Sequence, residues 1–160
     1  MNQFEITVQG LNNGVLETLA FPCEMDEAAK VIVNVSEYGQ HDFEIVDYDA
    51  PFAINELHIM SLNEIAELPQ DKYEAFISFC NCGLSFKEAV KYTLYYEYQV
   101  YNNAKDMSDV AYQMLQDDVA FQEAPSFMRI HFDYESYGET LCASGEFYED
   151  TINKRIIQML

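Results

Sequence analysis

The sequence predicts an α+β fold, arranged as an elongated chain of three small units. An α+β unit is expected over residues 1–60, a helical unit over 61–103 and a second α+β unit over 104–160. Two patterns carry this prediction: apolar and polar residues alternate as in strands near both ends of the chain, and apolar residues recur at helical spacing in the middle. Each unit is near the size at which one hydrophobic core is marginal, so the units must pack on one another or on a second chain.

The first unit begins with a predicted β-hairpin. Residues 3–8 alternate in polarity, and Asn12-Asn13-Gly14 supplies turn residues before a second strand over 15–21. From Asp26, apolar residues at positions i, i+3, i+4 and i+7 predict a helix that packs on the sheet. Residues 42–48 alternate again and predict a third strand.

The middle unit contains the tetrapeptide signature Ser-x-x-Glu twice, at Ser61–Glu64 and at Ser85–Glu88. In a capping box of this kind, the serine oxygen and the glutamate each bind a backbone N–H at the start of a helix. Pro69 and Gly83 interrupt the apolar pattern between and after these signatures. The sequence therefore predicts three short helices within residues 61–92.

The last part of the chain combines strands and helices. Residues 95–101 are expected to form a short strand, and a helix is expected from about Asp106 to Asp118. Asp133 can cap a further helix that ends at Gly145. Residues 146–150 and 155–159 then predict a closing hairpin.

The charge of the chain is its most restrictive property. Twenty-eight acidic residues stand against eight basic ones, which gives a net charge of -20 on 160 residues. Disordered acidic tails contain few aromatic residues, but this chain has 12 Tyr and 11 Phe and should bury a core. A strongly negative surface repels nucleic acid and destabilises the compact state. We therefore expect no nucleic-acid ligand and look for a function that requires the charge.

Motifs for catalysis are missing from the sequence. It contains no Gly-rich phosphate loop, no G-x-S-x-G and no H-E-x-x-H, and its three His are scattered. Asp47-Tyr-Asp49 begins like a calcium loop, but Pro51 and Phe52 stand where a ligand and the turn glycine belong. We expect no catalytic residues, no metal and no cofactor. Because 28 carboxylates always include close pairs, a small carboxylate hydrolase stays open as an alternative.

The chain also lacks the sequence signals of membrane insertion and secretion. No stretch of 18 apolar residues occurs, and the first residues do not combine a basic segment with an apolar one. The expected location is therefore the cytoplasm, with no membrane partner.

Several acidic residues lie three or four positions apart without a lysine partner at helical spacing. Such like-charge pairs cost a few tenths of a kcal/mol each. Twenty excess charges equal the charge of about 34 Å of duplex DNA, or roughly ten base pairs. The pattern predicts an electrostatic decoy that fills the cationic groove of a DNA-binding enzyme. The pairs are Glu64 with Glu67, Asp106 with Asp109, and Glu135 with Glu139.

We expect the decoy surface to consist of many dispersed carboxylates, none of them essential alone. Residues 31–71 contain no basic residue and hold nine of the candidates. The candidate partner-binding carboxylates are Glu37, Asp42, Glu44, Asp47, Asp49, Glu56, Glu64, Glu67, Asp71, Glu74, Asp106, Asp109, Asp117, Asp118, Glu135 and Glu139.

Four segments in consistent order resemble the ArdA family of antirestriction proteins: Asn12–Gly14, Phe43–Asp49, Ser61–Glu67 and His131–Glu139. The resemblance covers essentially the whole chain. It implies a DNA mimic, usually carried on a conjugative element in a bacterial host, that occupies the DNA site in the methyltransferase core of type I restriction-modification enzymes. It also implies an elongated, curved chain of three domains that forms a homodimer through its C-terminal domain.

The most specific part of the resemblance is the antirestriction motif of the family, which the resemblance places toward the dimer interface. A capped helix with Tyr134, Tyr137 and Leu141 on one stripe is also typical of a packing element. The chain has no Trp, and Leu11 stands where an aromatic residue usually precedes Asn-Asn-Gly. An acidic protein that sequesters another basic DNA-binding host protein is the alternative function. The matching motif residues are Phe132, Asp133, Tyr134, Glu135, Tyr137 and Gly138.

Overall fold

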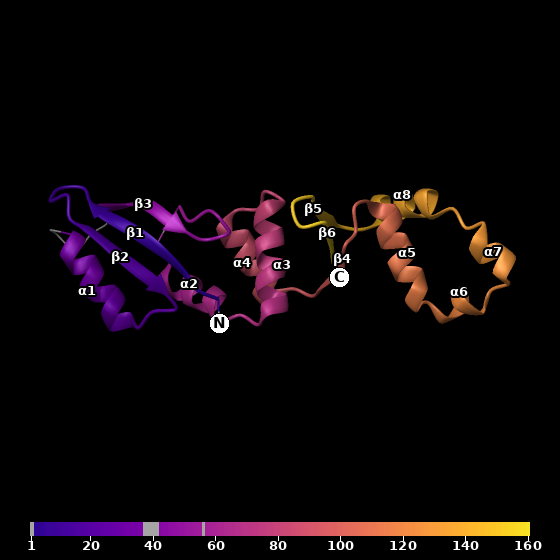
Figure 1. Cartoon of the computed structure of the whole chain (residues 1–160), viewed down its shortest axis with the longest axis horizontal. Helices are drawn as coiled ribbons and strands as arrows, with labels where there is room; N and C mark the ends of the chain where they lie inside the picture. Colours follow the sequence, from indigo (N-terminus) through magenta and orange to yellow (C-terminus); the bar gives the residue numbers. More distant parts are fainter. Residues whose placement is uncertain (1, 37–41, 56) are drawn as a thin grey trace. The chain divides into compact units, whose positions relative to one another are not determined.

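The computed structural model describes residues 2–36, 42–55 and 57–160. It confirms a mixed α+β fold with two small antiparallel sheets (Figure 1). The chain divides into two compact units: an N-terminal unit of residues 1–80 and 84–93, and a C-terminal unit of residues 81–83 and 94–160. The three-unit arrangement, with boundaries after residues 60 and 103, stays a prediction.

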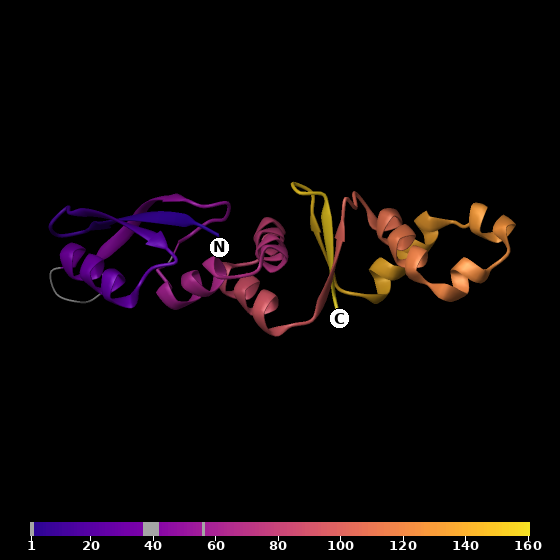
Figure 2. The same ribbon diagram turned by 60° about the horizontal axis from the view of Figure 1, so that its bottom comes forward.

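The N-terminal unit contains a three-stranded sheet in the order β2-β1-β3. Strand β1 (Phe4–Gly10) pairs antiparallel with β2 (Leu16–Phe21) and with β3 (Phe43–Asp49). Helix α1 (Met25–Val35) lies on one side of this sheet (Figure 2). Gly14, with φ at +67°, takes the left-handed conformation in the β1–β2 turn. The predicted hairpin, helix and third strand are confirmed.

Three helices follow, as predicted for residues 61–92, and they belong to this unit except for the last residues of the second and third: α2 (Ile59–Ala66), α3 (Gln70–Asn81) and α4 (Phe86–Tyr95). An aromatic cluster joins α3 to the sheet. The ring of Phe52 lies with its centroid 4.9 Å from that of Phe76 on α3 and 5.2 Å from that of Phe4 on β1, in edge-to-face geometry.

The two Ser-x-x-Glu signatures have different structures. At α4, the Glu88 backbone N–H donates to Ser85 Oγ at 3.3 Å, and the Ser85 N–H and Oγ donate to Glu88 Oε2 at 3.1 and 2.6 Å. This is the predicted capping box. The prediction of a capping box at Ser61 was wrong, because α2 begins at Ile59, after His58, and Ser61 lies inside the helix. Burial of apolar residues further along α2 fixes this helix without a side-chain cap: Leu62, Ile65 and Ala66.

The two serines offer a matched test of capping. We expect Ser85→Ala to lower the free energy of unfolding by about 1 kcal/mol, because the alanine leaves a backbone N–H of the first turn without its acceptor. Ser61→Ala should leave stability unchanged or slightly raised, since alanine is the better residue inside a helix. Urea unfolding of both variants measures the difference, and an equal loss in the two would contradict the assignment.

The C-terminal unit contains the second sheet, in the order β4-β6-β5. Strand β6 (Arg155–Met159) pairs antiparallel with β4 (Tyr98–Asn102) and β5 (Phe147–Asp150), and β5 and β6 form the predicted hairpin. The strand predicted over residues 95–101 begins later than expected, because α4 continues to Tyr95.

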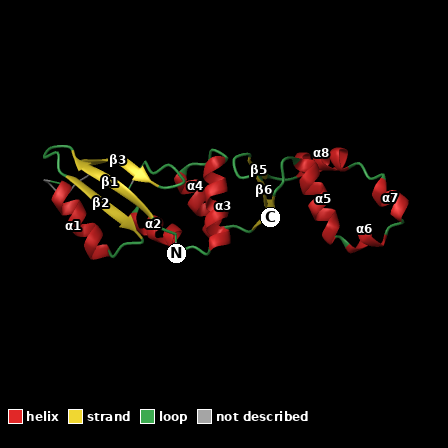
Figure 3. Cartoon of the chain, viewed as in Figure 1, coloured by secondary structure: helices red, strands yellow, loops and turns green. Residues whose placement is uncertain are grey.

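Four helices occupy the segment between β4 and β5 (Figure 3): α5 (Met107–Asp117), α6 (Val119–Glu123), α7 (Ser126–Ile130) and α8 (Tyr134–Ser144). Helices α5 and α8 agree with the prediction. The helix expected to reach Asp118 ends one residue earlier, because the Asp118 carboxylate accepts from the Phe121 N–H and caps α6.

One carboxylate of this unit is buried. Asp150 is 1% exposed at the end of β5. Its oxygens accept from the Asn81 amide at 3.2 Å, from the backbone N–H groups of Ile152 and Asn153 at 3.1 Å, and from the Asn153 amide at 2.8 Å. These donors satisfy the buried charge and close the β5–β6 turn.

Candidate functional site

Both units are strongly acidic. The N-terminal unit has sixteen acidic residues against four lysines, and the C-terminal unit has twelve against two lysines and two arginines. Glu37 and Glu56 lie outside the described residues. Of the other fourteen candidate carboxylates, three are half-buried: Asp42, Glu74 and Asp109. Eleven are exposed: Glu44, Asp47, Asp49, Glu64, Glu67, Asp71, Asp106, Asp117, Asp118, Glu135 and Glu139.

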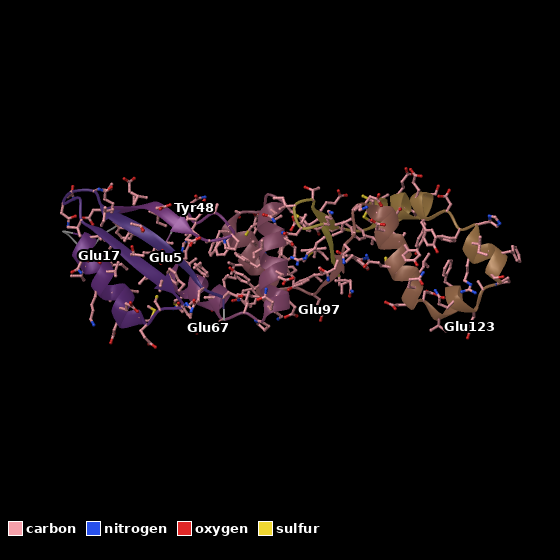
Figure 4. All side chains as sticks on the ribbon, in the orientation of Figure 1. Glu5, Glu17, Tyr48, Glu67, Glu97 and Glu123 are labelled. Carbon is pink, nitrogen blue, oxygen red and sulfur yellow. The ribbon has the colours of Figure 1, made fainter. Side chains whose placement is uncertain are left out.

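Four exposed carboxylates share the outer face of the first sheet. Glu44, Asp47 and Asp49 on β3 pair in register with residues of β1 that point away from the core, Glu5 among them. Partners in register share a face of the sheet, so these carboxylates lie together. Glu5 is labelled in Figure 4. We call Glu5, Glu44, Asp47 and Asp49 the acidic sheet face. The opposite face of β1 is buried through Phe4, Ile6 and Val8.

Glu5 was absent from the predicted set, although its place between two apolar residues of an alternating strand marks it as exposed. A β-bulge on β3 opposite Thr7 and Val8 shifts the register by one residue. The shift leaves both Glu44 and Asp47 on the outer side, at a spacing that a regular strand would place on opposite faces.

Asp42 has a structural role. Its carboxylate accepts from the Ser36 hydroxyl at the end of α1 and from the Asn12 amide of the hairpin loop at 3.3 Å. Its carbonyl accepts from the Leu11 N–H at 2.7 Å. Asp42 therefore ties three segments of the N-terminal unit together.

Other candidate carboxylates cap helices or loops. Asp106 Oδ1 accepts from the backbone N–H groups of Ser108 and Asp109 at the start of α5, at 2.9 and 3.1 Å. Asp109 accepts from the Lys105 N–H at 2.8 Å, and Glu74 accepts from the Gln70 amide at 3.0 Å. A second group makes no side-chain hydrogen bond or ion pair within the described residues: Glu44, Asp49, Glu64, Glu67, Asp71, Asp117, Glu135 and Glu139.

The residues of the predicted motif form a packing element. Asp133 Oδ1 accepts from the Ser136 N–H at 3.0 Å and caps α8. The centroid of the Phe132 ring lies 5.0 Å from that of Tyr134, 5.6 Å from that of Tyr137 and 5.1 Å from that of Phe121 on α6. All three contacts are edge to face.

Gly138, in the middle of α8, lies against the start of α5. A Cβ atom at this position would be 2.6 Å from the carbonyl oxygen of Met107. Two helix backbones approach this closely only where one of them has no side chain. By contrast, Glu135 and Glu139 of the same helix are exposed.

The capping hydrogen bonds predict how stability depends on pH. The Asp109 N–H lowers the pKa of Asp106, and the Ser136 N–H lowers the pKa of Asp133. Because the folded-state pKa is below the unfolded value, this contribution is present above about pH 4 and is lost as pH falls through the folded pKa.

We therefore expect a melting temperature that changes little from pH 7 to 5 and falls below about pH 4, where the two capping carboxylates become protonated. Thermal unfolding followed by circular dichroism measures this profile. A double variant, Asp106→Asn with Asp133→Asn, should show a shallower fall in acid. A melting temperature that still rises at the lowest pH would contradict the role of the caps.

Two observations concern the thiol of Cys82 and metal binding. Burial, together with the charges of Asp150 and Glu149, raises the pKa of Cys82 to about 11, so the thiol stays protonated at neutral pH. Within the described ranges, no three His, Cys, Asp or Glu side chains lie close enough to hold a metal ion. The Asp47–Asp49 segment belongs to β3, not to a metal-binding loop.

Comparison with protein families agrees with this picture. The family model of the antirestriction protein ArdA matches residues 10–153. The chain belongs to the ArdA family. This match covers most of the chain and confirms the resemblance found in the four segments. No curated protein matches the chain.

ArdA proteins are antirestriction proteins and not a family of catalytic enzymes, which implies that this chain acts on restriction enzymes by interaction. In the part of the ArdA chain that the structure describes, no helix is both long and apolar enough to span a membrane.

Proposed function

We propose that the chain is a DNA mimic that occupies the DNA-binding groove of a type I restriction-modification enzyme and thereby inhibits it. The main support is the acidic sheet face, where Glu5, Glu44, Asp47 and Asp49 lie together on an exposed surface. An array of carboxylates fixed on a sheet can meet lysines and arginines that otherwise bind phosphates.

Other exposed carboxylates that make no hydrogen bond within the described residues are further candidates for contact with the enzyme. They are Glu64, Glu67 and Asp71 in the N-terminal unit and, on α8 of the C-terminal unit, Glu135 and Glu139. Forming a contact with a partner costs these side chains no existing hydrogen bond. We therefore propose that they contribute more to binding than Asp42, Asp106 and Asp118, which hold local structure.

We also propose that the chain forms a homodimer through its C-terminal unit. Helices α6 and α7 expose several large apolar side chains: Val119 is 69% exposed, Phe127 65% and Ile130 75%. Exposed apolar residues gathered on neighbouring elements are typical of interaction surfaces. The cytoplasm of a bacterial host is the location where this function would be exerted.

The alternative function is sequestration of another basic DNA-binding host protein, which the same carboxylates would favour. The two functions can be separated by competition. A labelled duplex with the recognition sequence is bound to the methyltransferase core of a type I enzyme, and the chain is added in increasing amounts. We expect displacement of the duplex, with an inhibition constant that rises steeply with salt concentration.

Two outcomes would contradict the proposal. The first is a ternary complex of enzyme, duplex and chain, which would place the contact outside the DNA groove. The second is no binding to the enzyme together with tight binding to a basic nucleoid protein, which would favour sequestration.

A further inference from the structure

The N-terminal unit contains a cavity of about 510 Å³ between the segment that leads into α2 and the start of α4. This volume lies in the range of small-molecule binding sites. Three of its lining residues come from the first segment, Asn55, His58 and Ser61, and the others come from α4 and its cap, among them Phe86, Lys87 and Val90.

One wall of the cavity is aromatic. The rings of His58 and Phe86 lie 8° from parallel, with centroids 6.3 Å apart. Phe86 also contacts Phe76 edge to face, with ring centroids 5.8 Å apart, and Phe52 in a tilted arrangement, with ring centroids 6.2 Å apart. A planar ligand can therefore pack against a surface that already exists in the free protein.

The formal charge of the described lining residues is positive, whereas the net charge of the whole protein is negative. Lys87 is the one formally charged residue among the described lining residues, and no carboxylate lines the cavity there. The side chains of Asn55, Ser61 and Lys87 make no hydrogen bond within the described residues. Ser85 is already engaged with Glu88 in the capping box. The available groups are thus an ammonium, an amide and a hydroxyl, beside an aromatic wall.

We propose that this cavity binds a small aromatic carboxylate, with the ring against His58 and Phe86 and the carboxylate on the ammonium of Lys87. The Glu88 carboxylate, which is bonded to Ser85 at the cavity, and the more distant acidic residues repel such a ligand. Salt at physiological strength screens the charges beyond a Debye length of about 8 Å, whereas the contact with Lys87 is direct. This binding site is independent of the proposed inhibition of restriction enzymes.

The test is an NMR titration of the full chain with indole-3-acetate as the probe. We expect amide shifts confined to the cavity, including those of Asn55 and Val90. Lys87→Gln should weaken binding about tenfold, the size of one charge-assisted hydrogen bond. Lys72→Gln is the matched control, because it removes the same charge from an exposed position on α3 outside the cavity. The affinity of Lys72→Gln for the probe should equal that of the wild type.

A neutral probe, 3-methylindole, separates the ring from the charge. It should bind more weakly than indole-3-acetate to the wild type and equally to the wild type and Lys87→Gln. Unchanged spectra up to millimolar probe would overturn the proposal, as would equal losses in the two lysine variants. Spectra that superimpose outside the cavity show that the variants are folded. No restriction enzyme takes part, so failure here leaves the competition experiment unaffected.

Discussion

Replacement of Gly138 by alanine is expected to destabilise the C-terminal unit strongly. The added Cβ would lie 2.6 Å from the Met107 carbonyl oxygen, 2.7 Å from its carbonyl carbon and 3.0 Å from the Ser108 nitrogen. All three are backbone atoms at the start of α5, so no side-chain rotation relieves the clash, and α8 must move away. Overpacking of this kind costs about 1–3 kcal/mol.

Cys142→Ala is the matched control for Gly138→Ala, because Cys142 lies one turn further along α8 and is exposed. Urea unfolding should show a loss for Gly138→Ala and little change for the control. Gly138→Ala should also inhibit restriction less, in proportion to the fraction that is unfolded. Full stability together with lost inhibition would contradict a packing role and would instead place Gly138 in contact with the partner.

Removal of the four charges of the acidic sheet face is expected to weaken inhibition substantially. The variant combines Glu5→Gln, Glu44→Gln, Asp47→Asn and Asp49→Asn. If each carboxylate makes one exposed ion pair with the enzyme, each contributes about 0.2–1 kcal/mol. The four together then account for about 1–4 kcal/mol, which corresponds to a loss from about fivefold to several hundredfold. The salt dependence of binding should become shallower as well.

The control for this variant removes four charges from the side of the sheet that carries α1. Glu17→Gln, Glu24→Gln, Asp26→Asn and Glu27→Gln give the same net charge on the same unit. Competition with the labelled duplex compares the two variants directly. Equal losses would mean that only the total charge matters, and the specific role of the acidic sheet face would then be wrong.

Patterns within one element predicted most of the secondary structure. The alternation in β1, the apolar spacing of α1 and the cap of α8 at Asp133 depend on neighbours in sequence, and all three are confirmed. Ser61 and Ser85 mark the limit. Each begins a Ser-x-x-Glu signature, but only Ser85 caps a helix. Buried contacts with the rest of the unit decide where each helix begins, and the local sequence does not reveal those contacts.

Local sequence was also insufficient to predict which carboxylates of the candidate surface are available for binding. Asp42 and Glu44 are two residues apart in one acidic segment, yet Asp42 is held by Ser36 and Asn12 whereas Glu44 makes no hydrogen bond in the described structure. Glu5 meets Asp49 only through the pairing of β1 with β3. Composition could predict an acidic surface, but the strand register and long-range hydrogen bonds determine which carboxylates are free to bind.

The buried carboxylate of Asp150 limits how far this chain could be neutralised by redesign. Its oxygens accept hydrogen bonds from donors on Asn81, Ile152 and Asn153. An asparagine there would bring an NH₂ group toward other donors, so the turn would lose an acceptor. A library that converts acids to amides one by one should therefore retain this position, whose negative charge belongs to the scaffold and is hidden from any enzyme.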